Sequence, residues 1–200
     1  MCGFRGENFG VIYYITPMSK ALFLLAAGFE ELEFIAPYDI LSRGGVEVKT
    51  SSISDKKEVS GVHGVTVSAD SILQQLEGLP FDLLVLPGGG LGTDNLLKSN
   101  LVKNLLIKSY EVGKKIAAIC AAPTVLAKAG ILSKHEITGY PSIKEDIKPY
   151  CKKYLDVPVV VSENIITSKG AGTAAEFGFC LLSLMVSPET AEDVKRKMRF

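Results

Sequence analysis

The chain has 200 residues, of which 47% are hydrophobic and 22% are charged, and its 22 basic residues balance its 22 acidic ones. This balance is that of an ordinary soluble globular protein, no charge run suggests nucleic-acid binding, and no apolar stretch reaches the roughly 18 residues that a membrane span needs. The length suits one domain with a substantial core. Four irregularly spaced cysteines favour neither a disulfide framework nor a zinc site, so a reducing, cytoplasmic setting is expected; they are Cys2, Cys120, Cys151 and Cys180.

Residues 1–17 are predicted to be a weakly ordered arm that precedes a single domain over residues 18–200. Met18 is followed by a strand-like apolar run at 21–26, which would itself make a natural start. A secretory signal is disfavoured, because polar residues and Pro17 interrupt the arm.

The segment 28–41 is predicted to be a helix, because acidic residues crowd its first turn and two glycines follow its end. Five apolar residues approximate one helical face, which we expect to be buried: Leu32, Ile35, Ala36, Ile40 and Leu41. Glu33 lies near the edge of that face. Its carboxylate is either solvated, as is usual at such a position, or points inward and keeps its proton because its pKa is raised.

Residues 46–51 are predicted to be a second strand, and residues 59–68 a hairpin or an edge excursion that carries His63. A lone histidine in such a place is more often a surface or interface residue than a metal ligand. Asp70 is expected to cap a short helix that reaches Leu76.

A third strand is predicted over residues 81–87, and it is followed by three glycines, Gly88, Gly89 and Gly90. Glycines after a strand permit positive φ angles and let backbone N–H groups approach a ligand or a developing oxyanion. The alternative is a flexible turn. A phosphate-binding loop is disfavoured, because the Gly-Lys-Ser/Thr ending of such loops is absent.

Residues 95–112 are predicted to be one helix, and the apolar run 115–119 a buried strand that leads to Cys120. Pro123 suits a first helical turn, so a helix is expected to begin within a residue or two of Cys120. At a helix N-terminus the unpaired N–H groups and the dipole favour a thiolate near neutral pH. The alternative is a buried cysteine that acts as a small hydrophobic side chain.

The rest of the chain continues the alternation of strands and helices. In order, we expect a strand at 135–139, a helix at 142–154, strands at 157–162 and 165–168, and helices at 170–186 and from 188 onward. Cys180 is expected to lie in the core. Strands that alternate with helices predict a mostly parallel sheet covered on both faces, with ligands at the carboxyl ends of its strands. Cys120 and the glycines 88–90 occupy such ends.

Four motifs follow one another along the chain: Gly-Phe-Glu-Glu-Leu-Glu at 28–33, Leu-Pro-Gly-Gly at 86–89, Ala-Ala-Ile-Cys-Ala-Ala-Pro at 117–123, and the stretch 162–177. In these motifs the sequence resembles the ThiJ/PfpI superfamily, in the branch of the Parkinsonism-associated protein deglycase. The resemblance covers nearly everything after Met18. It implies a flavodoxin-like, three-layer α/β sandwich of the class I glutamine amidotransferase type, with a strained nucleophile elbow.

The same resemblance implies the site residues. Cys120 would be the reactive cysteine, and Glu33 would supply a carboxyl group beside it. The backbone amides of Gly89 and Ala121 would form an oxyanion hole, with Gly88 beside them.

One position departs from the family pattern. Where many relatives carry a histidine before a proline, this chain has Tyr140. A neutral tyrosine cannot act as a general base at pH 7 as an imidazole can, so a cysteine–histidine–acid triad is not expected. Tyr140 is nevertheless a candidate third active-site residue.

The implied function is that of a glutathione-independent glyoxalase, or a related protein deglycase, which acts on small dicarbonyls such as methylglyoxal. Cys120 would add to the aldehyde and Glu33 would move protons, with no cofactor and no metal. The alternative is an oxidative-stress sensor or redox-regulated chaperone, in which Cys120 is oxidised to a sulfinate held by Glu33. Thiazole-monophosphate biosynthesis, a label that such sequences also carry, has no support from any residue.

The expected partners are a dicarbonyl substrate and a second copy of the chain, with no nucleic acid and no membrane. Relatives pair through the first helix and the hairpin. The resemblance therefore implies a homodimer with Glu30, Arg43 and His63 at its interface.

Overall fold

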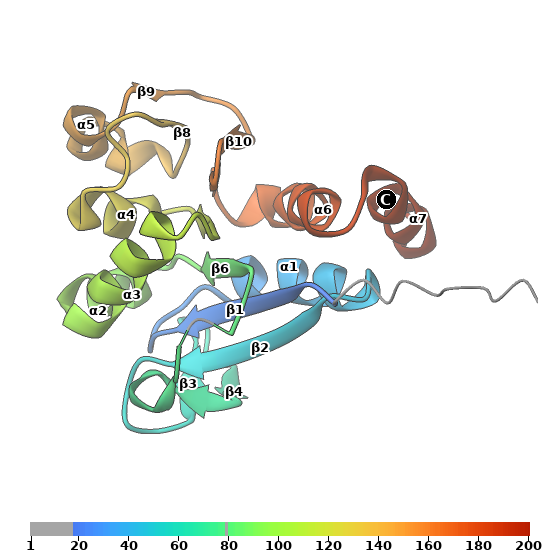
Figure 1. Cartoon of the computed structure of the whole chain (residues 1–200), viewed down its shortest axis with the longest axis horizontal. Helices are drawn as coiled ribbons and strands as arrows, with labels where there is room; N and C mark the ends of the chain where they lie inside the picture. The colour runs from blue at the N-terminus through green and yellow to red at the C-terminus, as the bar shows by residue number, and fades with distance from the viewer. Residues whose placement is uncertain (1–17, 79) are drawn as a thin grey trace, which may run out of the picture.

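The computed structural model describes residues 18–78 and 80–200, so the arm predicted at residues 1–17 lies outside the described residues. A seven-stranded sheet forms its centre (Figure 1). Its strands are β1 (Lys20–Leu25), β2 (Glu47–Ser52), β5 (Ser71–Ile72), β6 (Leu83–Leu86), β7 (Lys115–Ile119), β10 (Val159–Ser162) and β11 (Ile165–Ser168). They lie in the order β10-β11-β7-β6-β1-β2-β5, and every pair is parallel except β10 with β11. The predicted mostly parallel sheet is confirmed.

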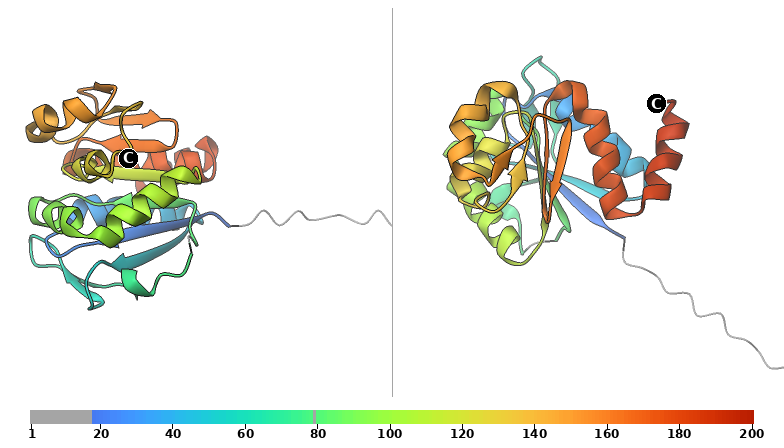
Figure 2. Two further views of the ribbon diagram at one scale, coloured as in Figure 1. Left: turned by 60° about the vertical axis from the view of Figure 1, so that its left-hand side comes forward. Right: turned by 90° about the horizontal axis from the view of Figure 1, so that it is seen from above.

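Helices cover both faces of this sheet (Figure 2). One face carries α1 (Glu31–Arg43) and α6 (Ala174–Met185), with α7 (Pro188–Met198) packed on α6; the other carries α2 (Gly90–Lys98), α3 (Asn100–Glu111), α4 (Pro123–Ala129) and α5 (Lys144–Ile147). Successive side chains of a strand point to opposite faces, so Phe23 of β1 lies in one core and Leu24 in the other. The result is the predicted three-layer sandwich. Within the described part of the chain, no helix is long and apolar enough to cross a membrane.

The helix predicted over residues 95–112 is two helices. Ser99 separates α2 from α3, and its Oγ accepts a hydrogen bond from the amide of Val102 at 3.3 Å. Serine is a favoured N-cap, because its side-chain oxygen satisfies an amide that has no partner within the helix. The cap therefore starts a new helix where the apolar pattern predicted a continuous one.

The strand predicted over residues 135–139 does not join the main sheet. Only β8 (Glu136–Ile137) is extended, and it pairs with β9 (Lys153–Tyr154) in a separate two-stranded sheet. The helix expected between them is reduced to α5 and two flanking 3-10 turns. Pro149 lies in the second turn, where it cannot donate the hydrogen bond that an α-helix would need.

Asp70 caps no helix. Its Oδ2 accepts hydrogen bonds from both the amide and the hydroxyl of Thr50, each at 2.8 Å. The residues after Asp70 form strand β5 and a 3-10 turn, Leu73–Gln75, in place of the predicted helix. The predicted hairpin is confirmed as β3 (Glu58–Ser60) and β4 (Thr66–Ser68).

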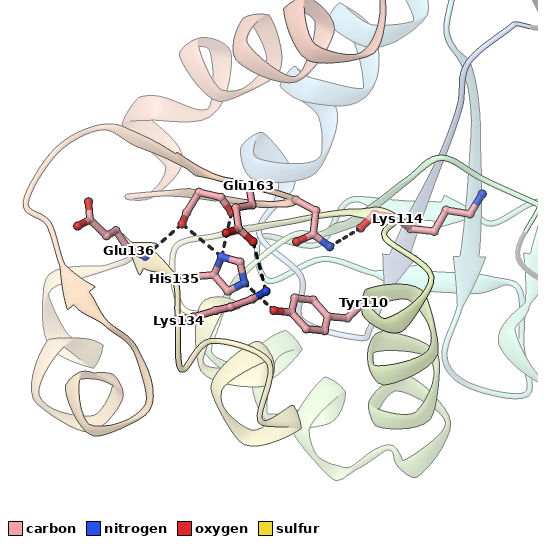
Figure 3. Close-up of polar contacts among 8 residues, drawn as sticks. Tyr110, Lys114, Lys134, His135, Glu136 and Glu163 are labelled. Carbon is pink, nitrogen blue, oxygen red and sulfur yellow. Dashed lines mark hydrogen bonds and ion pairs between the residues drawn. The ribbon is translucent and has the colours of Figure 1, made fainter.

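A polar cluster surrounds the buried ring of His135 near the start of β7 (Figure 3). It therefore lies at the end of this strand that is far from Cys120. Nε2 of His135 lies 2.8 Å from the hydroxyl of Tyr110, and its Nδ1 lies 3.0 Å from the carbonyl oxygen of Ser162. Because a carbonyl can only accept, Nδ1 carries the proton and Tyr110 donates to Nε2. Burial lowers the pKa of His135, although the bond to Ser162 opposes this effect.

His135 should make folding stability depend on pH. Its pKa is below the ordinary value of about 6.5 in the folded chain, so the unfolded chain takes up the proton first and stability is lost as the pH falls below about 6.5. The free energy of unfolding in urea, measured from pH 7.5 to 5, should show the gap between wild type and His135→Gln shrinking as the pH falls, by at most about 1.4 kcal/mol per pH unit. Tyr110→Phe, which keeps His135, should still lose stability as the pH falls. A difference in unfolding free energy between wild type and His135→Gln that does not change with pH would contradict the lowered pKa of His135.

Candidate active site

Cys120 lies between the carboxyl end of β7 and the start of α4. Its φ of +64° falls in the left-handed region, which residues other than glycine rarely adopt. Two hydrogen bonds hold this backbone: the Cys120 amide donates to the carbonyl oxygen of Ser168 at 2.9 Å, and the Cys120 carbonyl accepts from the amide of Tyr140 at 2.7 Å. This is the geometry of a nucleophile elbow, in which local strain is maintained by the surrounding structure.

The glycines after β6 make room for the elbow. A Cβ atom on Gly88 would lie 2.8 Å from Cβ of Cys120 and 2.5 Å from Oε2 of Glu33. On Gly89, whose φ is +89°, a Cβ atom would lie 2.5 Å from the carbonyl oxygen of Gly28. Both positions therefore require glycine because the chain approaches other groups closely, and the flexible-turn alternative does not apply.

Glu33 points inward from the first turn of α1 and is only 1% exposed. Its Oε2 accepts a hydrogen bond from the amide of Gly88 at 2.9 Å. Its own amide donates to Oε2 of Glu30 at 2.7 Å, so Glu30 is the N-cap of α1. Of the two alternatives for Glu33, the inward carboxyl group is the one present.

The prediction of a buried face on α1 is wrong for Leu32 and Ile35. Leu32 is 51% exposed and Ile35 is 44% exposed, whereas Ile40 and Leu41 are buried as predicted. The first turns of the helix bury Glu33 and Phe34 instead. This orientation is tolerated because the amide of Gly88 satisfies the buried carboxyl group, and it leaves two large apolar side chains at the surface.

The surroundings of Glu33 favour its neutral form. The pKa of Glu33 is raised to about 7, mainly by burial and in part by the nearby carboxylate of Glu30, while bonds from the Cys120 thiol and the amides of Gly88 and Ala171 oppose the rise. A carboxyl group that is ordinarily ionised is therefore only about half ionised at neutral pH.

The expected thiolate is not what the surroundings of Cys120 favour. Burial raises the pKa of Cys120 to about 12, and the charge and hydrogen bond of Glu33 add to the rise, which outweighs the lowering by the amides of Gly89 and Ala121. The dipole argument was wrong because it left out desolvation and a neighbouring carboxylate.

The thiol and the carboxyl group titrate as a pair. The pair loses its first proton near pH 7 and its second near pH 12, so a single proton remains above about pH 7 and into the basic range. That proton lies on the sulfur or on Glu33. The form with the thiolate beside a neutral carboxyl group is the nucleophilic one.

The amides of Gly89 and Ala121 favour the ionised sulfur, because hydrogen bonding from both lowers the pKa of Cys120. Among the described residues, neither amide donates to a carbonyl oxygen. Both therefore remain candidates for the oxyanion hole.

Tyr140 takes the place of the missing histidine. It is half exposed, and a Cβ atom on Gly170 would lie 3.5 Å from Cδ2 of its ring and 4.0 Å from Sγ of Cys120. His63 lies in the hairpin region and His135 in the buried cluster, so neither histidine lies at the elbow.

The predicted interface residues lie along α1. Glu30 and His63 lie at its start, where Nδ1 of His63 is 2.9 Å from Oε2 of Glu31. Arg43 pairs with Asp39 at the other end, about 20 Å away by helical rise. The ligand atoms of Glu30, Glu31 and His63 lie within 4.8 Å of one another and could hold a metal ion, but the bond between His63 and Glu31 already accounts for this arrangement.

Gly170 and Ala171 also contribute to the site, although they were not among the predicted site residues. Both follow β11, a parallel neighbour of β7, so they lie at the same edge of the sheet as Cys120. The rule that selected the glycines after β6 could have found them, because they too follow the carboxyl end of a strand.

One family model covers most of the chain. It is described as the DJ-1/PfpI family, and it matches residues 19–184. The chain belongs to this family. The elbow, the inward carboxyl group and the glycines described above are thus features of a DJ-1/PfpI protein.

Members of the DJ-1/PfpI family match this chain over nearly its whole length. The glutathione-independent glyoxalase DJ-1 of Schizosaccharomyces pombe is 31% identical over 188 residues, which cover 90% of this chain and 98% of that protein. The crystal structure of Drosophila melanogaster DJ-1beta has a TM-score of 0.87 at 38% identity, covering 90% of this chain and 97% of that one. The structure of oxidized Toxoplasma gondii DJ-1 has a TM-score of 0.86 at 30% identity, and the match covers 91% of this chain and 98% of that one.

Proposed function

We propose that this protein is a glutathione-independent glyoxalase with deglycase-like activity, which converts methylglyoxal and related dicarbonyls without a cofactor. The observation that carries the proposal is the pair of the half-buried Cys120, on a strained elbow, and the buried Glu33, which titrate together. The name of the Schizosaccharomyces pombe relative, which matches almost end to end, supports it.

The reaction begins when the sulfur of Cys120 adds to the aldehyde carbon and the oxygen takes up the proton of the pair, which gives a hemithioacetal. Glu33 then removes the proton from that carbon and returns a proton to the neighbouring one, so an enediol becomes a thioester beside a new alcohol. Water hydrolyses the thioester, which releases lactate and restores the thiol. One methylglyoxal and one water thus give one lactate, and the amides of Gly89 and Ala121 stabilise each oxyanion.

Steady-state loss of methylglyoxal in the absence of glutathione tests this proposal. We expect continued turnover by the purified protein without added metal or cofactor. Loss of no more than one methylglyoxal per protein would contradict it.

A second candidate is redox sensing, which the oxidized structure of Toxoplasma gondii DJ-1 favours. Peroxide would transfer one oxygen to the Cys120 thiolate to give a sulfenic acid, and a second peroxide would give the sulfinate. The amides of Gly89 and Ala121 and a protonated Glu33 would donate to its oxygens. A sensor undergoes one oxidation event per cysteine, whereas an enzyme forms many products, so product counting separates the two.

We infer that the protein forms a homodimer through α1 and the adjoining loop between β3 and β4. Four large apolar side chains are exposed there: Leu32, Ile35, Val62 and Val65. The loop rests on the start of α1, because the amide of Val62 donates to the carbonyl oxygen of Phe29 at 2.9 Å and that of His63 to Glu31 at 2.7 Å. Contiguous exposed apolar surface is typical of an interface.

Light scattering at micromolar concentration should therefore return about twice the chain mass of 21.5 kDa. Leu32→Asp should return a mass near that of one chain, because a charge would be buried in the interface. Val112→Asp, a matched change at an exposed apolar residue after α3, should remain a dimer. A monomeric wild type would contradict the inference.

A further inference from the structure

A hollow of about 360 Å³ lies beside the reactive sulfur. It is lined by Tyr140, Pro141 and residues 169–173. The Cβ position of Gly170 lies 4.0 Å from Sγ of Cys120 and 3.5 Å from Cδ2 of Tyr140. The missing side chain at Gly170 therefore keeps space open between the sulfur and the ring, where the rest of a substrate attached to Cys120 would lie.

Two polar side chains at this hollow, Lys169 and Thr173, already have partners. The ammonium group of Lys169 pairs with Asp156. The hydroxyl of Thr173 donates to the carbonyl oxygen of Gly170 at 2.8 Å and lies 2.7 Å from the hydroxyl of Ser168. What remains for a ligand is the ring of Tyr140, Pro141 and backbone atoms, and such surface suits an apolar group better than a charged one.

We propose that this hollow is a subsite for the apolar substituent of the dicarbonyl, with Tyr140 as its aromatic wall, and that aryl-substituted 2-oxoaldehydes are the preferred substrate class. The inference rests on the proposed glyoxalase function. Tyr140 is well placed for this role, because its backbone is fixed to the elbow by the bond to the Cys120 carbonyl while its ring stays half exposed. Aromatic rings pair edge to face or offset, and the gain exceeds that from apolar burial alone.

The test is kcat/KM for phenylglyoxal, methylglyoxal and glyoxal with wild type, Tyr140→Ala, Tyr140→Phe and Gly170→Ala. Wild type should prefer phenylglyoxal to glyoxal. Tyr140→Ala should lower that preference about fivefold, mainly through KM, and Tyr140→Phe should retain it because the ring remains. Gly170→Ala should also lower it by filling the space. The new methyl group makes ordinary contacts, and the backbone there is extended with φ of 163°, so the fold should tolerate the change.

The outcomes distinguish failure of the subsite from failure of the proposed glyoxalase function. An unchanged preference in both Tyr140→Ala and Gly170→Ala, or an equal loss with all three substrates, would overturn the subsite while the glyoxalase function stands. Turnover of none of the three substrates by wild type would overturn the function and the subsite together.

Discussion

Cys120→Ser should lower kcat/KM for methylglyoxal by about 10³-fold or more, the loss expected when the nucleophile of a covalent mechanism is removed. A serine hydroxyl beside Glu33 has a far higher pKa than a thiol, and the buried carboxyl group, with a pKa of about 7, is too weak a base to ionise it. Steady-state kinetics on both proteins measure the effect.

Cys180→Ser is the matched control. Cys180 is also half-buried and its pKa is also raised by burial, but it lies on α6. This variant should keep wild-type kinetics. If Cys120→Ser retained full turnover, the elbow would have no role in the chemistry.

Glu33→Gln should lower dicarbonyl turnover by about 10²-fold or more, the contribution of general acid–base catalysis. Glutamine keeps the shape and can still accept from the amide of Gly88, but it cannot carry a proton between carbon and oxygen. The wild-type rate should change with a midpoint near pH 7, where the pair loses its first proton, and the variant should lose this feature.

Peroxide oxidation of Cys120 should survive Glu33→Gln better than turnover does, since oxidation needs no proton transfer between carbons. Full dicarbonyl turnover by Glu33→Gln would mean that Glu33 is only structural. Kinetics of Tyr140→Phe would then show whether the tyrosine hydroxyl carries the proton.

Apolar runs predicted the sheet well, because a buried parallel strand needs apolar side chains on both faces. Strand β7 has the predicted bounds, 115–119, and Cys120 follows it directly. The split at Ser99 was not predicted, although its signal is local: a serine inside a helical segment is a favoured N-cap.

The features that the sequence alone did not resolve depend on residues far apart in the chain. Glu33 points inward because the amide of Gly88, 55 residues away, satisfies its carboxylate. The pKa of Cys120 reflects burial and the charge of Glu33, neither of which appears in the local pattern of a cysteine before a helix. His135 is buried because Tyr110 and Ser162 bind both of its ring nitrogens.

The most direct test of the shared-proton mechanism is the conversion of methylglyoxal in D₂O, followed by proton NMR. The account predicts many lactate molecules per protein, each with deuterium at the carbon next to the carboxylate, because Glu33 exchanges its proton with solvent before returning it. Lactate that carries only hydrogen at that carbon would show that no exchangeable group carries the proton. No more than one product per Cys120 would contradict catalytic turnover itself.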